Sequence, residues 1–244
     1  MKSPLVPPVS ARSAVLSLLL GAHPPTLSGR EIVRAMELFG IAESTTRVAL
    51  TRMTASGDLT RHDAVYTLSD RLAQRQRDVE PPEKKVWDRT WEMAIVTTTG
   101  RSATDRVALR RDMRRQRVAE LREGVWTRPA NLRRPWPHRL NEVTTCFEAV
   151  PLSDAATLVA QLWDLASWAA RGHGYLDAFD AVGDEPTRFK TMVAAVHHLQ
   201  TDPLLPEEFL PADWPAGALT TIYDDYRAWL AAVRGQMGPA GSDG

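Results

Sequence analysis

The chain has 244 residues and a single cysteine, Cys146, which excludes an intrachain disulfide and favours a reducing compartment. No apolar run approaches the roughly 18 to 20 residues that span a bilayer. The apolar segment 14–20 resembles the core of a secretory signal, but it is short, Arg12 lies close before it, and no small-x-small cleavage site follows. These absences predict a cytoplasmic protein without a membrane anchor.

Motifs for cofactors, metals and nucleophiles are also missing. The sequence contains no G-x-G-x-x-G, no P-loop, no G-x-S-x-G and no zinc-ligand spacing, so we expect no cofactor. Cys146 lies within a predicted strand without activating neighbours, and we expect a buried structural thiol. His198 and Asp202 have a spacing that two metal ligands can share, but Asp202 precedes Pro203, where a helix should end. We therefore expect no metal site.

The formal net charge is zero, but the charge is unevenly distributed along the chain. Residues 1–80 hold 10 Lys+Arg against 8 Asp+Glu, residues 81–140 hold 15 against 7, and residues 141–244 hold 5 against 15. The balances are +2, +8 and −10. Such steps indicate three regions with different partners, or a basic region that docks on an acidic one.

The N-terminal region has the element order of a winged helix-turn-helix. Apolar spacing predicts helices over about 11–20 and 28–39 and a third over the segment "ESTTRVALTRMTA", which ends before Gly57. Two short strands, 59–61 and 65–68, follow around a turn. In this motif the third helix enters the major groove of DNA, and the paired strands form the wing.

The spacing of apolar and polar residues in the third helix predicts a DNA-binding face opposite its buried side. Short polar side chains and Val48 would meet base edges, Arg47 and Arg52 would reach phosphates or guanine, and the wing would grip the backbone. The alternative is an ordinary solvated helix face. The predicted DNA-binding residues are Ser44, Thr45, Arg47, Val48, Thr51 and Arg52 on the helix, and Arg61 and His62 on the wing.

The sequence of the central region predicts a small α+β layer. After a short helix over 70–77 and a linker at Pro81-Pro82, we expect a strand over 91–98, a helix over 103–121, and strands at "GVWTRP" and "EVTTCFEAV". This order resembles a ferredoxin-like unit. The helix places four arginines in one arc, which predicts a phosphate-binding stripe, a solvated face or a face paired with the acidic C-terminal region. They are Arg106, Arg110, Arg114 and Arg117.

The C-terminal region is predicted to be helical. Apolar faces recur after Ser153, between Phe189 and Leu199, and between Leu219 and Val233, whereas "RGHGYL" at 171–176 predicts a helix-ending turn. Four prolines in segment 202–215 exclude a regular helix there. Four aromatic residues predict either an apolar cavity or ordinary core packing, namely Trp163, Trp168, Tyr175 and Trp214.

Three sequence blocks together resemble the PaaX family of bacterial transcriptional regulators. They are "LGAHPP…AMELFGIAESTTRVALTRMTASGDL", "LREGVWTRPANL" and "DPLLPEEFLPADWP", in this order over nearly the whole chain. The resemblance implies an α+β multidomain protein with a winged helix-turn-helix in 1–80, a ferredoxin-like central domain in 81–152, a helical domain in 153–234 and a disordered tail in 235–244. It also implies a dimeric repressor that binds double-stranded operator DNA and is released by an aryl-CoA or acyl-CoA thioester.

Two functions follow from these observations. The first is a regulator of a catabolic operon, without enzymatic activity, whose homodimer contact lies outside residues 1–70. Its thioester effector would bind between the central and C-terminal regions, with phosphates on Arg106, Arg110 and Arg114 and the acyl group near Trp163 or Trp168. The alternative is a metal-dependent enzyme acting on nucleic acid or a CoA thioester through Asp105, Asp112 or Glu123 of the central domain.

Overall fold

A computed structural model describes residues 5–6, 8–22, 24–70, 72–73, 82–181 and 183–236, the last four without their side chains. The chain forms two compact units. The first comprises 1–79, 171–199 and 215–244, and the second comprises 80–170 and 200–214. Among the described residues, no helix is both long and apolar enough to cross a membrane.

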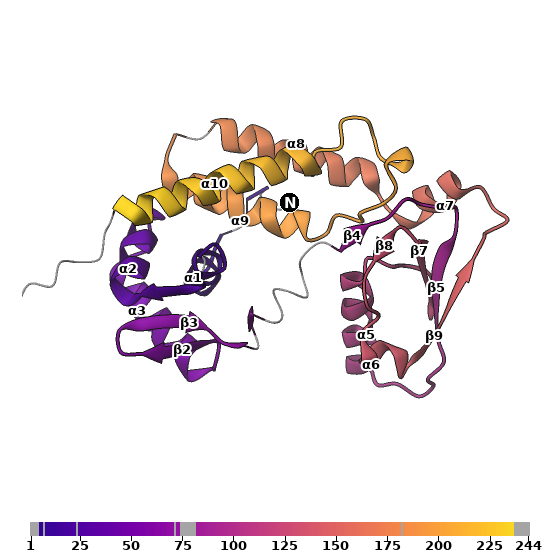
Figure 1. The fold of residues 1–244 in the computed structure, drawn as a ribbon, viewed down its shortest axis with the longest axis horizontal. Coiled ribbons are helices and arrows are strands. Elements are labelled where there is room, and N and C mark those ends of the chain that lie inside the picture. Colours follow the sequence, from indigo (N-terminus) through magenta and orange to yellow (C-terminus); the bar gives the residue numbers. More distant parts are fainter. Residues whose placement is uncertain are drawn as a thin grey trace, which may run out of the picture. The chain divides into compact units, whose positions relative to one another are not determined.

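The first unit contains a winged helix-turn-helix (Figure 1). Its helices are α1 (Ala11–Leu20), α2 (Gly29–Leu38) and α3 (Glu43–Ala55), and its strands are β1 (Thr26–Ser28), β2 (Leu59–His62) and β3 (Val65–Leu68). The strands pair antiparallel in the order β1-β3-β2. Ser10 caps α1, and Ser28 forms a capping box with Glu31 at the start of α2. The three predicted helices and two wing strands are confirmed, and β1 is an addition.

The core of this unit joins the winged helix to C-terminal helices. These are α8 (Leu165–Ala181), which begins in the second unit, α9 (Glu185–Leu199) and α10 (Ala216–Gln236). Phe39 at the end of α2 stacks on Phe189 of α9 with ring centroids 3.7 Å apart. Buried residues of α1, α2 and α3 share one cluster with Met192, Val193 and Tyr226. The winged helix is therefore stabilised by residues far away in sequence. The boundaries at 80 and 152 stay predictions.

The predicted turn at 171–176 is wrong, because these residues lie inside α8. Gly172 is needed for packing rather than for chain reversal. A Cβ atom at this position would lie 2.5 Å from the Cγ atom of Pro215, at the start of α10. Glycine therefore permits a close approach that any larger residue would prevent.

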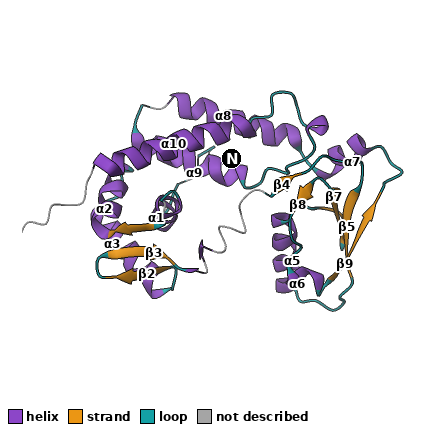
Figure 2. Ribbon diagram, viewed as in Figure 1, coloured by secondary structure: helices purple, strands orange, loops and turns teal. Residues whose placement is uncertain are grey.

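The second unit is built on a four-stranded antiparallel sheet. Its elements are β5 (Trp91–Val96), α5 (Ala103–Arg115), β6 (Ala119–Arg122), β7 (Val125–Pro129), α6 (His138–Asn141) and β9 (Thr144–Ala149). The strand order is β6-β7-β5-β9, and Figure 2 shows α5 and α6 on one side of the sheet. The order βαββαβ is ferredoxin-like, so the α+β fold class is confirmed. Strands β4 (Glu83–Lys84) and β8 (Leu132–Arg133) form a separate pair.

Three details of the central region differ from the sequence predictions. Helix α5 ends at Arg115 instead of reaching residue 121, because Arg117 adopts a positive φ of 60° and the chain turns into β6. Strand β5 ends at Val96 rather than at residue 98. Cys146 is exposed rather than buried, because β9 is an edge strand whose residues after Thr144 are all exposed. Most of the short helix predicted for 70–77 lies outside the described residues.

The proline-rich segment after α9 is held to the sheet by Arg128. This residue lies on β7 and its side chain is 0% exposed. Its guanidinium donates to the carbonyl oxygens of Arg117, Pro129, Pro203 and Leu204 and to the side-chain oxygen of Asn131. One buried arginine therefore satisfies the carbonyl groups of residues 203 and 204, which lie outside any helix or strand.

The sheet face opposite α5 and α6 supports the remaining short elements of this unit. Helix α7 (Ala155–Leu162) and the 3₁₀ turn η1 (Glu207–Phe209) surround an apolar cluster around Trp91, Val159 and Leu205. Burial of these side chains attaches segment 200–214 to the sheet, in addition to the hydrogen bonds of Arg128.

Candidate nucleic-acid interface

Helix α3 has two distinct faces. Its inner face is buried and consists of Thr46, Ala49, Leu50 and Met53, as the apolar spacing predicted. Its outer face is exposed at all six predicted positions, and Val48, a large apolar residue, is 50% exposed. The outer residues are Ser44, Thr45, Arg47, Val48, Thr51 and Arg52. A helix packed on one side and polar on the other has the form needed to enter a DNA groove.

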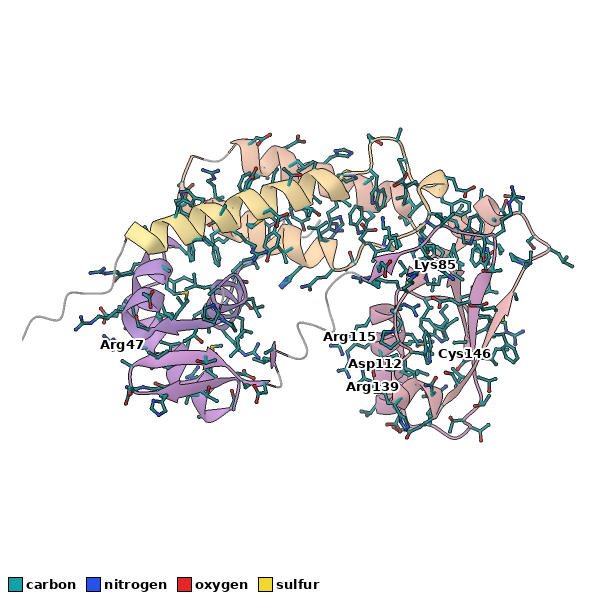
Figure 3. All side chains as sticks on the ribbon, in the orientation of Figure 1. Arg47, Lys85, Asp112, Arg115, Arg139 and Cys146 are labelled. Carbon is teal, nitrogen blue, oxygen red and sulfur yellow. The ribbon has the colours of Figure 1, made fainter. Side chains whose placement is uncertain are left out.

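Arg47, which Figure 3 labels, forms an ion pair within its own helix. Its Nε donates to Oε1 of Glu43 at 2.7 Å, one turn earlier in α3. The side chain of Arg47 is nevertheless 71% exposed. An exposed pair of this kind contributes little to stability, so its guanidinium can exchange the carboxylate for a phosphate or a base. Thr51 donates its hydroxyl to the Arg47 carbonyl oxygen at 3.0 Å.

The wing places its two predicted contact residues at an exposed hairpin. Arg61 Nε donates to the carbonyl oxygen of Asp63 at 2.8 Å, and its guanidinium lies 5.7 Å from the ring centre of Tyr66. His62 Nδ1 lies 3.3 Å from a carboxylate oxygen of Asp63, and both side chains are almost fully exposed. The turn is thus partly ordered by the arginine that would contact DNA.

A partly buried ion pair connects the wing to the first helix. Arg12 of α1 donates from Nε and a terminal nitrogen to Oδ2 of Asp58 at 3.0 and 2.8 Å, and Asp58 is 5% exposed. Asp58 immediately precedes β2, and its carbonyl accepts from Ser69 beyond β3. The pair therefore fixes the base of the wing, a role that no local sequence pattern indicates.

The predicted arginine stripe lies on the exposed side of α5, but without Arg117. Arg106 donates to the Arg101 carbonyl, Arg110 pairs with Glu120 of β6 at 3.1 Å, and Arg114 is exposed. Arg117 follows the end of the helix, and burial lowers its pKa. The stripe thus comprises three arginines, of which one is already paired.

The aromatic residues proposed for a ligand pocket occupy separate surroundings. Trp163 lines a cavity of about 710 Å³ between α7, the start of α8 and η1, together with Leu162 and Phe209. Asp164 and Glu208 also line it, whereas Arg106, Arg110 and Arg114 do not. Trp168 stacks on Trp214 at 4.2 Å and donates to Thr201. The lining combines apolar side chains with Gln161 and two carboxylates and contains no Lys or Arg, which suits an uncharged group better than phosphates.

Two of the three carboxylates considered for metal-dependent catalysis have structural roles. Asp105 forms the capping box of α5 with Ser102. Asp112 is mostly buried and pairs with Arg111, Arg115 and Arg139, and the last two are labelled beside it in Figure 3. Glu123 is exposed. Within the part of the chain that the structure describes, no group of three or more potential metal ligands occurs.

The chain matches two family models. The model described as PaaX-like protein covers residues 10–72, and the model described as PaaX protein central Cas2-like domain covers residues 84–160. These ranges correspond to the winged helix and to the ferredoxin-like sheet with the start of α7. No curated protein matches the chain.

A solved structure is similar over almost the whole chain. The uncharacterised protein Rv0674 from Mycobacterium tuberculosis is 44% identical, with a TM-score of 0.80, and the match covers 93% of this chain and 98% of that one. A match to Bacillus subtilis PadR covers 94% and 97%, but its 14% identity and TM-score of 0.26 are too low to carry an argument. The family models and the similarity to Rv0674 agree along the sequence, and the chain belongs to the PaaX-like protein family.

Proposed function

We propose that this protein is a cytoplasmic, sequence-specific DNA-binding regulator that represses a catabolic operon. The observation that carries the proposal is the outer face of α3, where six residues of suitable chemistry are exposed beside an exposed wing. Membership of a family that typically consists of transcriptional regulators supports it. Val48 would contact a thymine methyl group, short polar residues would contact base edges, and the arginines of α3 and the wing would contact phosphates or guanine.

DNA binding is tested by selecting bound duplexes from a fragmented genome with the purified full chain. The selected duplex is then titrated by fluorescence anisotropy at several salt concentrations. We expect tight binding to a defined sequence and a steep loss of affinity with salt, because phosphate contacts release counterions. Enrichment of no sequence, or equal affinity for scrambled duplexes, would contradict the proposal.

The effector in this proposal is an aryl-CoA or acyl-CoA thioester. The cavity lined by Trp163 supports the acyl end, and the stripe of Arg106, Arg110 and Arg114 is the candidate for the phosphates. The two acidic residues of the cavity favour an uncharged acyl group there. An effector that releases DNA must bind the free protein more tightly than the DNA-bound protein, and tenfold release requires about 1.4 kcal/mol of coupling.

The effector is tested by adding a panel of CoA thioesters to the complex of protein and selected duplex. Trp163→Ala should weaken release by aryl thioesters, whereas Trp168→Ala serves as a comparison at a tryptophan that stacks on Trp214 instead. Binding is measured in parallel by calorimetry without DNA. If no thioester binds and none changes the DNA affinity, this effector class is wrong, and the DNA-binding proposal is unaffected.

A further inference from the structure

Another cavity of the second unit lies on the side of the central sheet that α5 covers. It has a volume of about 220 Å³ and is lined by residues of β5 and β9, by Val118 and by Arg134 and Trp136. Cys146 on β9, labelled in Figure 3, lines this cavity and pairs in register with Ala94 on β5. Ala94 is buried in one cluster with residues of α5. Because residues directly opposite each other share a face of the sheet, the Cys146 side chain lies on that face too.

The thiol of Cys146 is the one cysteine nucleophile of the chain. Cys146 is exposed, so a reagent from solvent can reach it. Its Sγ lies 3.9 Å from Thr144 Oγ1, which donates its own hydrogen to the Leu140 carbonyl at 2.7 Å. The hydroxyl can therefore accept only a weak hydrogen bond from the thiol. A reagent that enters the cavity meets a single, weakly held sulfur atom.

Two buried donors in the wall of this cavity lack a partner among the described residues. The Arg134 side chain is 9% exposed, donates from Nη2 to Glu92 and places its guanidinium carbon 5.3 Å from the ring centre of Trp136. No described group accepts from Arg134 Nε or from Trp136 Nε1. Buried donors are nearly always hydrogen-bonded, so two unsatisfied donors beside a cavity point to an acceptor that binds there.

The charges around the cavity favour an anionic group at Arg134. Glu92 is shared by two arginines, because Arg128 Nε lies 3.5 Å from the same carboxylate oxygen that pairs with Arg134. Burial lowers the pKa of Arg134, and the negative charges of Glu92 and of the Cys146 thiolate oppose this effect. Two guanidinium groups on one carboxylate leave an excess of positive charge, which a ligand carboxylate would balance.

Glu148 adds the opposite charge to the same cavity. It follows Cys146 by two positions on β9, so both side chains lie on one face of the sheet. Glu148 is exposed and lines the cavity. The lining thus combines a thiol, a buried cation and an exposed carboxylate. A ligand that carries both a carboxylate and an ammonium group, and that reacts with thiols, fits this combination.

We propose that Cys146 is a site of reversible S-thiolation by a small zwitterionic disulfide, of which cystine is the simplest example. The Cys146 thiolate attacks one sulfur of cystine, a disulfide forms to the half that stays bound, and the S–S bond of cystine breaks. The other half leaves as cysteine thiolate and takes up the proton that Cys146 lost. Cystine is the oxidant, and exchange with a free thiol restores Cys146. In the adduct, the carboxylate accepts from Arg134 and the ammonium group donates to Glu148.

The volume of the cavity favours a ligand of this size. A water molecule occupies about 30 Å³ of the liquid, so about 220 Å³ holds roughly seven non-hydrogen atoms, which is the size of the bound half of cystine. Glutathione disulfide would add a tripeptide instead, and most of it would lie outside the cavity. We therefore expect a preference for the smaller disulfide.

The reaction is tested on the reduced full chain by following its intact mass with three reagents. They are cystine, the neutral disulfide of 2-mercaptoethanol, and cystamine, which carries only positive charges. Each rate is divided by the rate of the same reagent with the chain unfolded in urea, which removes differences in intrinsic reactivity. We expect one cysteinyl group, removable by dithiothreitol, and a normalised rate for cystine at least about tenfold above the other two. Glutathione disulfide should react more slowly than cystine, and Cys146→Ser should stay unmodified.

Two variants separate recognition of the ligand from simple exposure of the thiol. Glu148→Gln removes the partner of the ammonium group and should lower the normalised cystine rate about two- to fivefold, as expected for an exposed ion pair. Arg134→Lys keeps the charge but removes the planar guanidinium, and should lower the rate further. Neither should change the rate with the neutral disulfide. Glu123→Gln, at an exposed position outside the cavity, is the matched control and should change neither rate. Circular dichroism verifies folding, and Glu148→Gln alone suffices if Arg134→Lys does not fold.

Equal normalised rates for all the disulfides would mean an ordinary exposed thiol and would overturn the inference. The absence of an adduct with cystine would overturn it too, as would a preference for cystine that Glu148→Gln and Arg134→Lys both retain. Glutathione disulfide reacting as fast as cystine would show that the cavity does not select its ligand. These measurements involve neither DNA nor a CoA thioester, so their outcome is independent of the proposed function.

Discussion

Arginine is abundant both in the winged helix and in the central sheet, but the two regions use it in opposite ways. Arg47 and Arg52 on α3 are exposed, and Arg47 pairs with Glu43 of its own helix. Arg128 on β7 is completely buried and donates hydrogen bonds to groups up to 76 positions away in sequence. Exposure separates arginines that are available to a partner from arginines that hold the fold together.

Burial also shifts the pKa values of Arg128 and of its neighbour Glu92. Desolvation lowers the pKa of Arg128 to about 9, although Glu92 nearby favours its charged form. Burial likewise raises the pKa of Glu92, against the opposing effect of Arg134 and Arg128. The buried cluster is therefore stable only because its hydrogen bonds and charges are matched as a set.

The largest effect should follow from Arg128→Met. This change leaves the carbonyl oxygen of Pro203 without its donor, removes one of the two donors to the carbonyl oxygen of Leu204, and removes a buried charge beside Glu92. We expect a loss of about 3–5 kcal/mol in the free energy of unfolding, measured by urea denaturation. Arg133→Met, at an exposed position paired with exposed Glu83, is the control and should change stability by less than about 0.5 kcal/mol. Similar losses in both variants would remove the distinction between buried and exposed arginines.

Asp112→Asn should have an intermediate effect. Asp112 is 7% exposed and accepts from Arg115 of α5 and Arg139 of α6, at 3.4 and 3.0 Å. Without the carboxylate charge these arginines repel each other, and the ion pair between α6 and α5 becomes at most a neutral hydrogen bond. We expect a destabilisation of about 1–3 kcal/mol. Adding salt should reduce the difference from the wild type, because the repulsion that remains is at the surface. A difference that does not depend on salt would mean that packing dominates at this site.

Arg47→Ala should affect DNA binding and leave stability unchanged. The ion pair with Glu43 is exposed, so its loss costs the fold little. Affinity for the selected duplex should fall by about 1–3 kcal/mol if Arg47 reads a base. Arg47→Lys keeps the charge but cannot bind guanine through two parallel hydrogen bonds, so it separates base reading from phosphate binding. Equal affinity of wild type and Arg47→Ala would remove Arg47 from the interface.

The sequence predicted the structural features that depend on neighbouring residues, but not those that depend on contacts between residues far apart in the chain. The three helices of the winged helix and the inner face of α3 follow from local patterns, and all were found. The role of Gly172 depends on Pro215, and that of Arg128 on a segment that follows α9, so neither has a local signal. Exposure of Cys146 depends on the position of β9 at the sheet edge, which strand order decides.

The exposed positions of the candidate interface on α3 were predictable from the sequence, whereas the contact that anchors the wing was not. Helical periodicity correctly placed Ser44, Val48 and Arg52 on the outside, because burial of the opposite face defines that side. The pairing of Arg47 with Glu43 could have been read from their i,i+4 spacing. The anchoring of the wing by Asp58 could not, since its partner Arg12 is 46 residues away.

The smallest effect on stability should follow from Arg110→Gln. This variant tests whether the arginine stripe binds a ligand. Arg110 pairs with Glu120 at the surface, and this pair raises the pKa of Arg110 without burying it. We expect no measurable change in the thermal unfolding midpoint, because exposed ion pairs are screened by water and salt. If the stripe binds the phosphates of a CoA thioester, the variant should bind that ligand more weakly, and more so at low salt. Arg122→Gln, at an exposed position at the end of β6 outside the stripe, provides the matched control. Equal thioester binding by both variants and the wild type would show that Arg110 does not contribute to binding of the thioester.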